Sequence, residues 1–453
     1  MKNPNEKFHV VVIGAGMSGL HAALELKKKG KNVCLLEARD RVGGRSLNHT
    51  FKNGDLVDVG GQWVGPGHDR MYDLAKRYNL DTYPLYNRGD NLIRFKKNIK
   101  KYTGTIPKIN VLHLVQVGWM LWRFDQLAKT IDPESPYKHK HAEKWDGQTV
   151  QNWMEKNSFS KAAKKVFAIG IKAIFTVEPK ELSMLHALFY AKSGVSMDCL
   201  ISVDGGAQQD RIHGGTQSIC LAMADELGGS LYLDHAVSLI DHSEQGANVK
   251  CANGTSFSAD KLIIAVPPNQ LLRMQFDPLL SSNKDQLWQR MPAGSCIKCV
   301  AQYKTPFWRD KGLSGQTVGL DDELLVNVTF DNTEKGKNAG LLMGFIEGDN
   351  ARYWGQKSDE ERKEAVIECF AKYFGDEALT PIDYVDKDWS AEQWTRGCYA
   401  ANLGLGAWTE FGENLRSPVG VIHFAGTETA SQWYGYFEGA LQSAERAVKE
   451  VLV

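Results

Sequence analysis

A glycine-rich stretch near the N-terminus, Gly14-Ala-Gly-Met-Ser-Gly19, has the residue types and spacing of a phosphate-binding turn. Gly14 permits a tight turn, Gly16 leaves room for a pyrophosphate where a Cβ would stand, and Gly19 lets a helix pack closely on a sheet. The free N–H groups at the start of that helix attract phosphate charge. Glu37, further along, can accept hydrogen bonds from both ribose hydroxyls and disfavours a 2′-phosphate. The pattern predicts a dinucleotide site that does not suit NADP.

A second glycine pair with flanking cations follows at once, in Arg39-Asp-Arg-Val-Gly-Gly-Arg45. NAD and FAD share the first glycine motif, but in flavoproteins a second glycine stretch approaches the cofactor again. Arg45 can pair with a pyrophosphate through two parallel hydrogen bonds. The stretch therefore favours FAD, with a surface salt bridge as the alternative interpretation of Arg45.

Other chemistry has little support in the sequence. No Ser-His-Asp arrangement, zinc spacing or Walker motif is present, and His139 and His141 lie in a polar run typical of a solvated loop. Cys296 and Cys299 form a C-x-x-C pair in a segment that reads as a strand, where residues three apart point to opposite faces. We therefore expect no metal site. Lys298 is a charged residue within the same apolar strand, and burial would lower its pKa.

The elements that position these residues alternate between strands and helices at both ends of the chain. Residues 8–13 and 32–36 are apolar runs suited to parallel strands, and residues 20–29 between them have helical spacing. The strand, loop and helix pattern returns in residues 421–452. Residues 86–204 lose this rhythm, so we expect two domains that are each assembled from separate segments.

Composition narrows the class of protein. The 453 residues include 54 basic and 54 acidic side chains, which argues against nucleic acid as a partner. The N-terminus has no signal peptide, and no apolar run reaches the length of a membrane span. The richest apolar run, Val111 to Trp122, is better interpreted as a helix with one buried face than as a membrane span.

The cysteines are scattered through the chain, which indicates free thiols in a reducing compartment. We therefore expect a soluble, cytoplasmic protein.

Beyond these features, the chain resembles the flavin-dependent amine oxidases of the monoamine oxidase family over nearly its whole length. The most specific motifs are Gly397-Cys-Tyr399 and Ala425-Gly-Thr-Glu-Thr-Ala430, followed by Trp433-Tyr-Gly-Tyr-Phe-Glu-Gly439. The resemblance implies an α/β fold: a two-domain FAD-binding Rossmann-like (GR2-type) fold with an α+β substrate domain. The expected FAD-binding domain comprises residues 1–85, 205–290 and 390–453, and the expected substrate-binding domain comprises residues 86–204 and 291–389.

The resemblance also implies which residues contact FAD. Val237 would bond the adenine edge through its backbone, and Gly61, Gln62 and Trp63 would border the flavin ring. The full set of expected cofactor-binding residues is Gly14, Gly16, Gly19, Glu37, Arg39, Gly44, Arg45, Gly61, Gln62, Trp63, Val237, Cys398, Gly426, Thr427, Tyr436 and Phe437. Cys398 matches the cysteine that the mitochondrial enzymes join to the flavin by a thioether, so covalent FAD is expected. A free thiol packed beside the flavin is the alternative.

Three residues would carry the reaction. Tyr399 and Tyr436 match the paired aromatic rings that flank the amine in this family, with two ordinary core tyrosines as the alternative. Lys298 matches a lysine linked through a water to flavin N5, where it would assist reoxidation by oxygen; a lysine on the solvent face is the alternative. The expected substrate-binding residues are Gln208, Ile201, Ile174, Phe175 and Val328, with Leu200 beside them.

The resulting hypothesis is an oxidase of primary aryl-alkyl monoamines that yields aldehyde, ammonia and hydrogen peroxide. Its partners would be a small amine and oxygen, and a homodimer is possible. A polyamine oxidase would need an acidic residue along the cavity, and an L-amino-acid oxidase would need an arginine for the carboxylate. A non-catalytic flavoprotein and an NAD-linked dehydrogenase are further alternatives. The mitochondrial enzymes continue into a membrane anchor that does not follow Val453 here, so an unanchored enzyme is expected.

Overall fold

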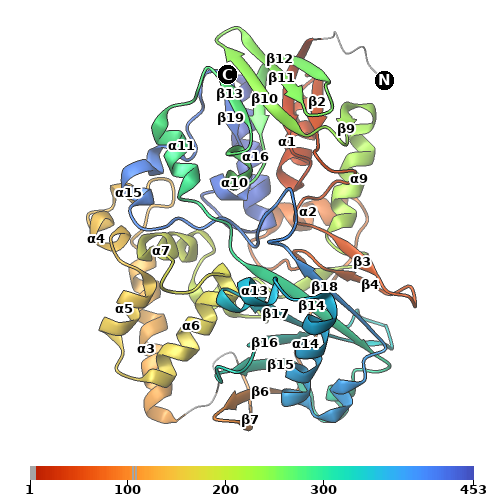
Figure 1. The fold of residues 1–453 in the computed structure, drawn as a ribbon, viewed down its shortest axis with the longest axis vertical. Coiled ribbons are helices and arrows are strands. Elements are labelled where there is room, and N and C mark those ends of the chain that lie inside the picture. Colours follow the sequence, from red (N-terminus) through yellow and green to blue (C-terminus); the bar gives the residue numbers. More distant parts are fainter. Residues whose placement is uncertain (1–6, 105–106, 108–109) are drawn as a thin grey trace.

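The computed structural model describes residues 7–104, 107 and 110–453. These residues form two large sheets that lie toward opposite ends of the long axis, with a group of helices beside the second sheet (Figure 1). Two short two-stranded sheets complete the strands: β3 (Asn48–Thr50) with β4 (Leu56–Asp58), and β5 (Thr82–Pro84) with β8 (Asp210–Ile212).

The first sheet is built around the strand that precedes the glycine-rich turn. Its strands are β1 (Lys7–Ile13), β2 (Val33–Leu36), β9 (Leu231–Tyr232), β10 (Val237–Ser243), β11 (Gly246–Cys251), β12 (Ser256–Ile264), β13 (Gln275–Asp277) and β19 (Ile422–Phe424). β1 pairs in parallel with β2 on one side and with β12 on the other. The end of β12 pairs in parallel with β19, so the C-terminal segment returns beside the N-terminal one. The apolar run of β1 is buried from Val10 to Ile13, as its sequence predicts.

Four helices pack around this sheet. They are α1 (Met17–Lys28), α2 (Asp69–Arg77), α9 (Gln217–Leu227) and α16 (Phe437–Leu452). α1 packs against both α9 and α16, and Leu20, Ala23, Leu441 and Ala444 share one buried cluster. The glycine-rich turn between β1 and α1 is therefore held by buried apolar contacts.

The second sheet is mixed, in the order β18-β14-β17-β16-β15-β6-β7. Its strands are β6 (Asp90–Phe95), β7 (Asn98–Tyr102), β14 (Cys296–Tyr303), β15 (Leu313–Gly319), β16 (Val328–Asp331), β17 (Gly340–Glu347) and β18 (Asp383–Asp388). Every residue of β14 and β17 is buried. Cys296 and Cys299 lie in different buried clusters, as the strand pattern predicts.

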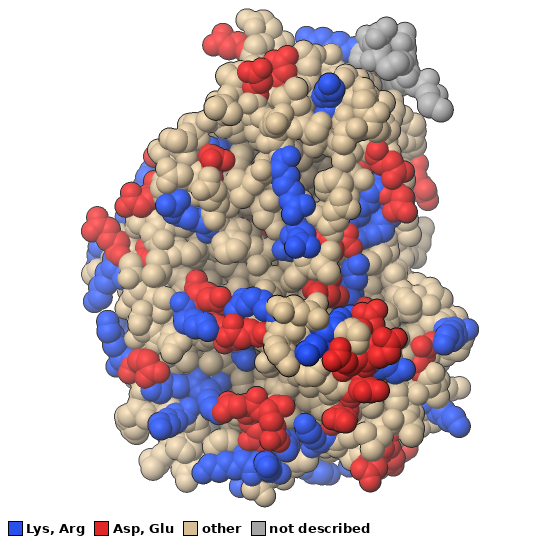
Figure 2. All heavy atoms as spheres, in the orientation of Figure 1, with Lys and Arg blue, Asp and Glu red and all other residues tan. Residues whose placement is uncertain are grey.

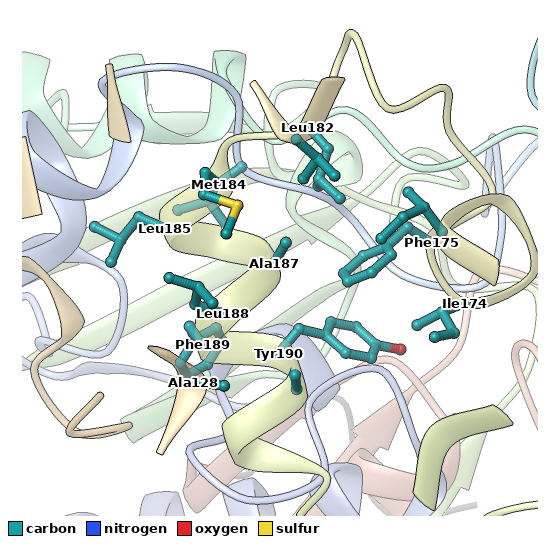
Figure 3. Close-up of a cluster of buried hydrophobic side chains, with 14 of the residues drawn as sticks. Ala128, Ile174, Phe175, Leu182, Met184, Leu185, Ala187, Leu188, Phe189 and Tyr190 are labelled. Atoms are coloured by element: carbon teal, nitrogen blue, oxygen red, sulfur yellow. The ribbon is translucent and has the colours of Figure 1, made fainter. Parts of the chain in front are cut away.

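A helical group lies beside the second sheet. It comprises α3 (Val111–Ala128), α4 (Ala142–Asp146), α5 (Val150–Asn157), α6 (Lys161–Phe175), α7 (Met184–Ser193) and α8 (Met197–Ile201). Figure 3 shows the cluster around α7, in which the Phe175 and Tyr190 rings lie 4.6 Å apart. α3 has the one-sided character predicted for it: Met120 and Phe124 are buried, whereas Trp119 and Trp122 are exposed.

The remaining helices lie between these elements in the sequence, and α14 packs on the second sheet. They are α10 (Pro268–Leu271), α11 (Ser282–Gln289), α12 (Phe307–Asp310), α13 (Asp349–Trp354), α14 (Asp359–Phe374) and α15 (Ala407–Phe411), with short 3₁₀ turns η1 (Pro136–Lys138), η2 (Gly228–Ser230), η3 (Asp376–Leu379), η4 (Gly412–Asn414) and η5 (Thr427–Thr429).

The strands of the two sheets come from separate segments of the chain, within the domain boundaries expected from the sequence. The strands of the first sheet fall within residues 1–85, 205–290 and 390–453, and those of the second fall within 86–204 and 291–389. The boundaries themselves stay a prediction. Basic and acidic side chains are interspersed over the face shown in Figure 2. Within the described ranges, no helix is both long and apolar enough to cross a membrane.

Candidate active site

A cavity of about 430 Å³ is lined by residues from both sheets and from the C-terminal segment. This volume lies in the range of small-molecule sites. The residues that the sequence singled out and that line it are Gly14, Gly16, Glu37, Arg39, Gly44, Arg45, Gly61, Gln62, Trp63, Ile174, Leu200, Gln208, Val237, Lys298, Cys398, Tyr399, Gly426, Thr427, Tyr436 and Phe437. The fold thus brings most of the candidate residues to one place.

The glycine-rich turn has the geometry that its sequence predicts. Gly14 has a φ of +100°, and a Cβ there would lie 2.8 Å from the Ala265 carbonyl oxygen. A Cβ on Gly19 would lie 1.8 Å from the Gly14 carbonyl oxygen, so this glycine allows close packing of helix on turn. By contrast, nothing lies within 4 Å of a Cβ built on Gly16. The open space at Gly16, next to the start of α1, fits the pyrophosphate of a dinucleotide.

Glu37 is buried at the end of β2, where backbone donors orient its carboxylate. Its Oε2 accepts from the Ala15 N–H at 2.7 Å, and its Oε1 accepts from the Arg39 N–H at 3.0 Å. The Arg39 side chain donates to Glu392 at 3.2 Å and to Thr395 at 2.6 Å. The carboxylate is therefore fixed at the cavity wall next to the glycine-rich turn.

Arg45 is held by a buried carboxylate of the C-terminal segment. Its Nη1 and Nη2 donate to Glu428 at 2.5 and 3.0 Å, and Nη1 also donates to the Tyr399 carbonyl oxygen at 2.7 Å. Burial alone would lower the pKa of Arg45, but the charge and hydrogen bond of Glu428 raise the pKa above its usual value. The arginine thus remains charged at the cavity wall, and its predicted contact with phosphate stays a prediction.

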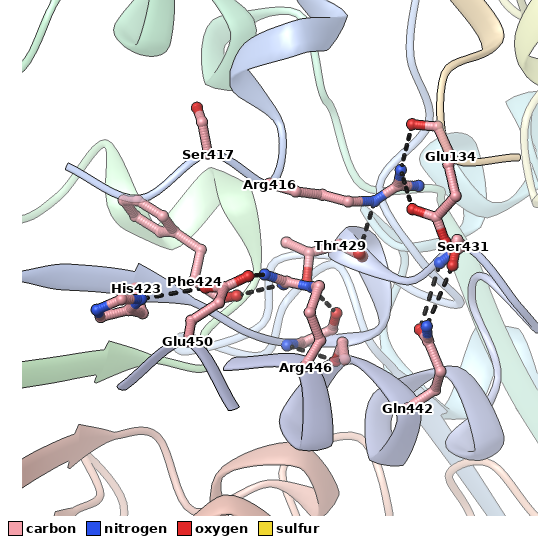
Figure 4. Close-up of polar contacts among 12 residues, drawn as sticks. Glu134, Arg416, Ser417, His423, Phe424, Thr429, Ser431, Gln442, Arg446 and Glu450 are labelled. Carbon is pink, nitrogen blue, oxygen red and sulfur yellow. Dashed lines mark hydrogen bonds and ion pairs between the residues drawn. The ribbon is translucent and has the colours of Figure 1, made fainter. Parts of the chain in front are cut away.

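Polar contacts fix the C-terminal segment against the first sheet. The Gly426 N–H donates to Ser18 and Ser443, each at 3.0 Å, and the Thr427 hydroxyl donates to the Tyr436 carbonyl oxygen at 2.9 Å. Figure 4 shows Arg446, which donates to the Phe424 carbonyl oxygen at 2.6 Å and to Thr429 at 3.1 Å. Figure 4 also shows Arg416, which donates to the Thr429 carbonyl oxygen at 3.0 Å.

Lys298 projects from β14 into a buried polar site. Its Nζ donates to the Gly60 carbonyl oxygen at 2.9 Å and to Gln62 Oε1 at 2.5 Å. Burial lowers the pKa of Lys298 to about 7, and the nearby charge of Asp58 opposes this shift. The solvent-face alternative for Lys298 is therefore wrong, because its side chain is almost fully buried. Near neutral pH this amine can both accept and donate a proton.

Two tyrosine rings line the cavity from different segments. The Tyr399 ring meets Phe345 edge to face, with centroids 5.6 Å apart, and its hydroxyl donates to Glu347 Oε1 at 3.3 Å. The Tyr436 ring packs against Trp433 at 5.3 Å and His68 at 5.6 Å. Each ring is therefore braced by further aromatic side chains.

Cys398 precedes Tyr399 and is buried at the cavity wall. Burial raises the pKa of the Cys398 thiol to about 12, although the nearby charge of Arg45 lowers it. The Cys398 carbonyl oxygen accepts from the Thr176 hydroxyl at 2.5 Å, and the Tyr399 N–H donates to the same hydroxyl at 3.2 Å. Thr176 thereby anchors the peptide unit that joins Cys398 to Tyr399.

Four residues that the sequence singled out do not line the cavity. Gly19 lies in α1 behind the turn, and Phe175 belongs to the buried cluster around α7. Ile201 is partly buried against that same cluster, and Val328 packs against a small cluster of the second sheet. A role for Phe175, Ile201 and Val328 in substrate binding stays a prediction.

The structure also adds residues that the sequence analysis missed. Phe345 and Tyr190 line the cavity, and Glu347 lies behind Tyr399. Glu347 ends the apolar run Gly340-Leu-Leu-Met-Gly-Phe-Ile-Glu347, so a lone charge in a buried strand was the available signal, as it was for Lys298. Among the described residues, no group of three or more histidine, cysteine or acidic side chains could hold a metal ion.

Comparison with known proteins places this site in a family. Residues 17–452 match the family of flavin containing amine oxidoreductases. The chain is 40% identical to a putative flavin-containing monoamine oxidase of Mycobacterium tuberculosis, with 99% of this chain and 97% of the relative covered. It is 37% identical to the flavin-containing amine oxidase A of Equus caballus, with 98% and 85% covered.

The solved structures that resemble this fold are also amine oxidases. The structure of wild-type putrescine oxidase bound to putrescine matches with a TM-score of 0.95 at 32% identity, covering 99% of both chains. The cyclohexylamine oxidase of Brevibacterium oxydans matches with a TM-score of 0.94 at 28% identity, covering 98% of this chain and 99% of that one. The fold is thus the two-domain FAD-binding fold predicted from the sequence. The chain belongs to the flavin containing amine oxidoreductases and is an FAD-dependent amine oxidase.

Proposed function

We propose that this enzyme oxidises primary aryl-alkyl monoamines to the imine and aldehyde, with release of ammonia and hydrogen peroxide. The observation that carries the proposal is that Tyr399 and Tyr436 share the cavity lining with apolar, aromatic and amide side chains. These side chains are Ile174, Tyr190, Leu200, Gln208 and Phe345. Such a lining suits an aromatic ring on a short alkyl chain.

The charges of the cavity argue against the rival substrates. Among its described lining residues, Glu37 is the one acidic side chain, and it lies beside the glycine-rich turn. Arg39 is paired with Glu37 and Glu392, and Arg45 is paired with Glu428. A second ammonium group, as in a diamine, would therefore meet no acidic side chain among the described lining residues apart from Glu37, and a substrate carboxylate would find Arg39 and Arg45 already paired.

The chain's residues have separate roles in this proposal. FAD would lie along the glycine-rich turn, Glu37, Arg45 and Thr427, and it would supply a two-electron acceptor for the hydride of the amine α-carbon. Tyr399 and Tyr436 would orient the amine between their electron-rich faces and exclude water. Gln208 lines the cavity, and its Oε1 is buried without a hydrogen-bond partner among the described residues, which suits a donor from the substrate.

Lys298 would handle the proton that accompanies reoxidation. Its pKa of about 7 lets the amine exchange a proton near neutral pH. Gln62 and the Gly60 carbonyl oxygen hold its Nζ in place. The role is supported by burial, by the shifted pKa and by its position on the cavity wall.

A panel of amines with peroxide detection tests the substrate class. Phenethylamine and tyramine are expected to give turnover at lower concentrations than putrescine, spermidine or L-amino acids. A preference for putrescine, the ligand in one structural neighbour, would replace the monoamine proposal with a diamine oxidase. The panel separates these outcomes because each class carries a different second charge.

We also propose that the flavin is attached covalently through the Cys398 sulfur. The thiol is buried, lines the cavity and is anchored by Thr176 on its peptide backbone. After acid precipitation, a yellow pellet and a protein mass increased by one FAD are expected, and Cys398→Ala would release the colour. A colourless wild-type pellet with unmodified mass would contradict covalent attachment and leave the amine oxidase proposal unaffected.

A further inference from the structure

The strongest unassigned feature near the cavity is a buried carboxyl group behind one of its tyrosines. Glu347 is the last residue of β17, and only 5% of it is exposed. It lies opposite Cys296 of β14 and on the same face of β17 as Phe345, two residues earlier. Glu347 and Phe345 therefore meet the same neighbour, Tyr399.

These two residues hold the Tyr399 ring at different points. Phe345 meets the ring edge to face at 5.6 Å, and Glu347 Oε1 accepts from the Tyr399 hydroxyl at 3.3 Å. The other cavity tyrosine is held differently, since Tyr436 forms no side-chain hydrogen bond to any described residue. Of the two tyrosines, Tyr399 is the one whose hydroxyl is hydrogen-bonded to a titratable side chain among the described residues.

The surroundings of Glu347 leave its charge weakly compensated. The charge of Lys172 in α6 and the hydrogen bond from Tyr399 lower the pKa of Glu347, and the charge of Glu178 raises it. Cys296 lies opposite Glu347 on the neighbouring strand β14. Lys172 forms no ion pair with Glu347; its Nζ donates to Asn327 at 3.4 Å. Burial is the dominant effect and raises the pKa of Glu347 to about 8. The carboxyl group is therefore mainly neutral at pH 7 and ionises in the mildly alkaline range.

We propose that Glu347 is a positioning residue that fixes the Tyr399 hydroxyl and sets the charge felt by an amine bound beside that ring. The proposal rests on the proposed amine oxidation. A neutral carboxyl favours the neutral amine, whose lone pair is needed when the α-carbon gives up its hydride. An ionised carboxylate favours the ammonium form, which binds but does not react.

Variants of Glu347 separate its hydrogen bond from its charge. Glu347→Gln keeps an oxygen that accepts from the Tyr399 hydroxyl and removes the ionisation. Glu347→Leu removes both. Glu178→Gln is the matched control, because Glu178 also affects the pKa of Glu347 but accepts from the Asp349 N–H and not from Tyr399. Flavin content and melting temperature establish that each variant is folded.

Binding of an amine that cannot be oxidised gives a readout other than turnover. The probe is 2-methyl-1-phenylpropan-2-amine, whose α-carbon carries no hydrogen, and its dissociation constant is taken from the flavin absorbance between pH 6 and pH 10. At each pH the dissociation constant of Glu347→Gln is divided by that of the wild type. Titration of the probe amine affects both constants equally and therefore cancels in this ratio. We expect this ratio to rise about tenfold through pH 8, because the ionised carboxylate of the wild type attracts the ammonium. In the Glu178→Gln variant Glu347 still ionises, so the corresponding ratio is expected to have the same value at pH 6 and at pH 10, with any deviation confined to the range in which Glu347 titrates.

Turnover at pH 7 tests the hydrogen bond. Glu347→Leu is expected to lower kcat/KM for phenethylamine about tenfold, whereas Glu347→Gln keeps most of it. The proposal is overturned if the binding ratio is flat with pH, if the probe does not bind, or if Gln and Leu lose activity equally. If the ratio rises as expected but wild type oxidises no aryl-alkyl monoamine, the inference about Glu347 stands and the proposed substrate class fails.

Discussion

Arg45 and Glu428 form a two-point ion pair that joins the second glycine stretch to the C-terminal segment. The same arginine donates to the carbonyl oxygen of Tyr399, and the Glu428 carboxylate also accepts from the Ala401 N–H at 3.2 Å. The pair therefore braces the chain directly after a cavity tyrosine, on either side of Ala400. It links the proposed cofactor site to the proposed substrate site.

Glu428→Gln is expected to destabilise the protein by about 3 kcal/mol, since it removes one partner of a buried ion pair. Glu25→Gln, which removes an exposed partner of Lys28 in α1, is the control and is expected to cost about 0.5 kcal/mol or less. Urea unfolding of both holoenzymes measures the difference. Equal, small effects of the two substitutions would show that the buried pair does not brace the fold.

Two glycine-to-alanine substitutions near the glycine-rich turn should impair different properties, one of them FAD binding and the other the stability of the fold. Gly16→Ala adds a methyl group where the protein leaves open space, so the variant should fold but bind FAD poorly. Gly19→Ala adds its methyl group 1.8 Å from the Gly14 carbonyl oxygen, so it should destabilise the fold itself. Flavin content and melting temperature distinguish the two. A Gly16→Ala variant with full flavin content would contradict the placement of the pyrophosphate.

Replacement of Lys298 should affect reoxidation of the enzyme. Lys298→Met is expected to slow reoxidation by oxygen about 100-fold and to leave anaerobic reduction by the amine largely unchanged. Lys284→Met is a matched control, because burial also lowers the pKa of Lys284 to about 7, but its Nζ donates to the Asn414 and Ser417 carbonyl oxygens outside the cavity. Stopped-flow absorbance follows each half-reaction. Similar reoxidation rates in wild type and Lys298→Met would exclude this role.

Stability should depend on pH through Glu347. Burial raises the pKa of Glu347 from its ordinary value of 4.5 to about 8, so the folded protein binds an extra proton between these values. Wild type should therefore lose stability relative to Glu347→Gln as the pH rises from 4.5 to 8, with no further change above that range. Melting temperatures of both proteins across this range measure the effect. A constant difference between them would mean that the carboxyl group titrates normally.

The sequence predicted the glycine-rich turn and the strands around it well because local chain geometry dictates them. The tight turn at Gly14, the close packing at Gly19 and the parallel pairing of β1 and β2 all follow from residue type and spacing. Lys298 could also be singled out, because a charge within an apolar strand is costly without a partner, and the fold buries it at the cavity wall. These features depend on residues close together in the chain.

The substrate end was harder to predict because it is assembled from distant segments. Ile174 lines the cavity, but its neighbour Phe175 does not. In the same way, Leu200 lines the cavity and the next residue, Ile201, does not. A helix turns neighbouring side chains in different directions, and its rotation is set by packing rather than by local sequence. Arg45 was predicted to contact phosphate, but its partners in the fold include Glu428, which is far away in the sequence.

The most direct measurement is the visible spectrum of the purified enzyme before and after anaerobic addition of phenethylamine. The account predicts the bands of oxidised flavin, their loss on addition of the amine, and their return with hydrogen peroxide when oxygen is admitted. A protein without a flavin spectrum, or a flavin that no aryl-alkyl monoamine reduces, would contradict the proposed function.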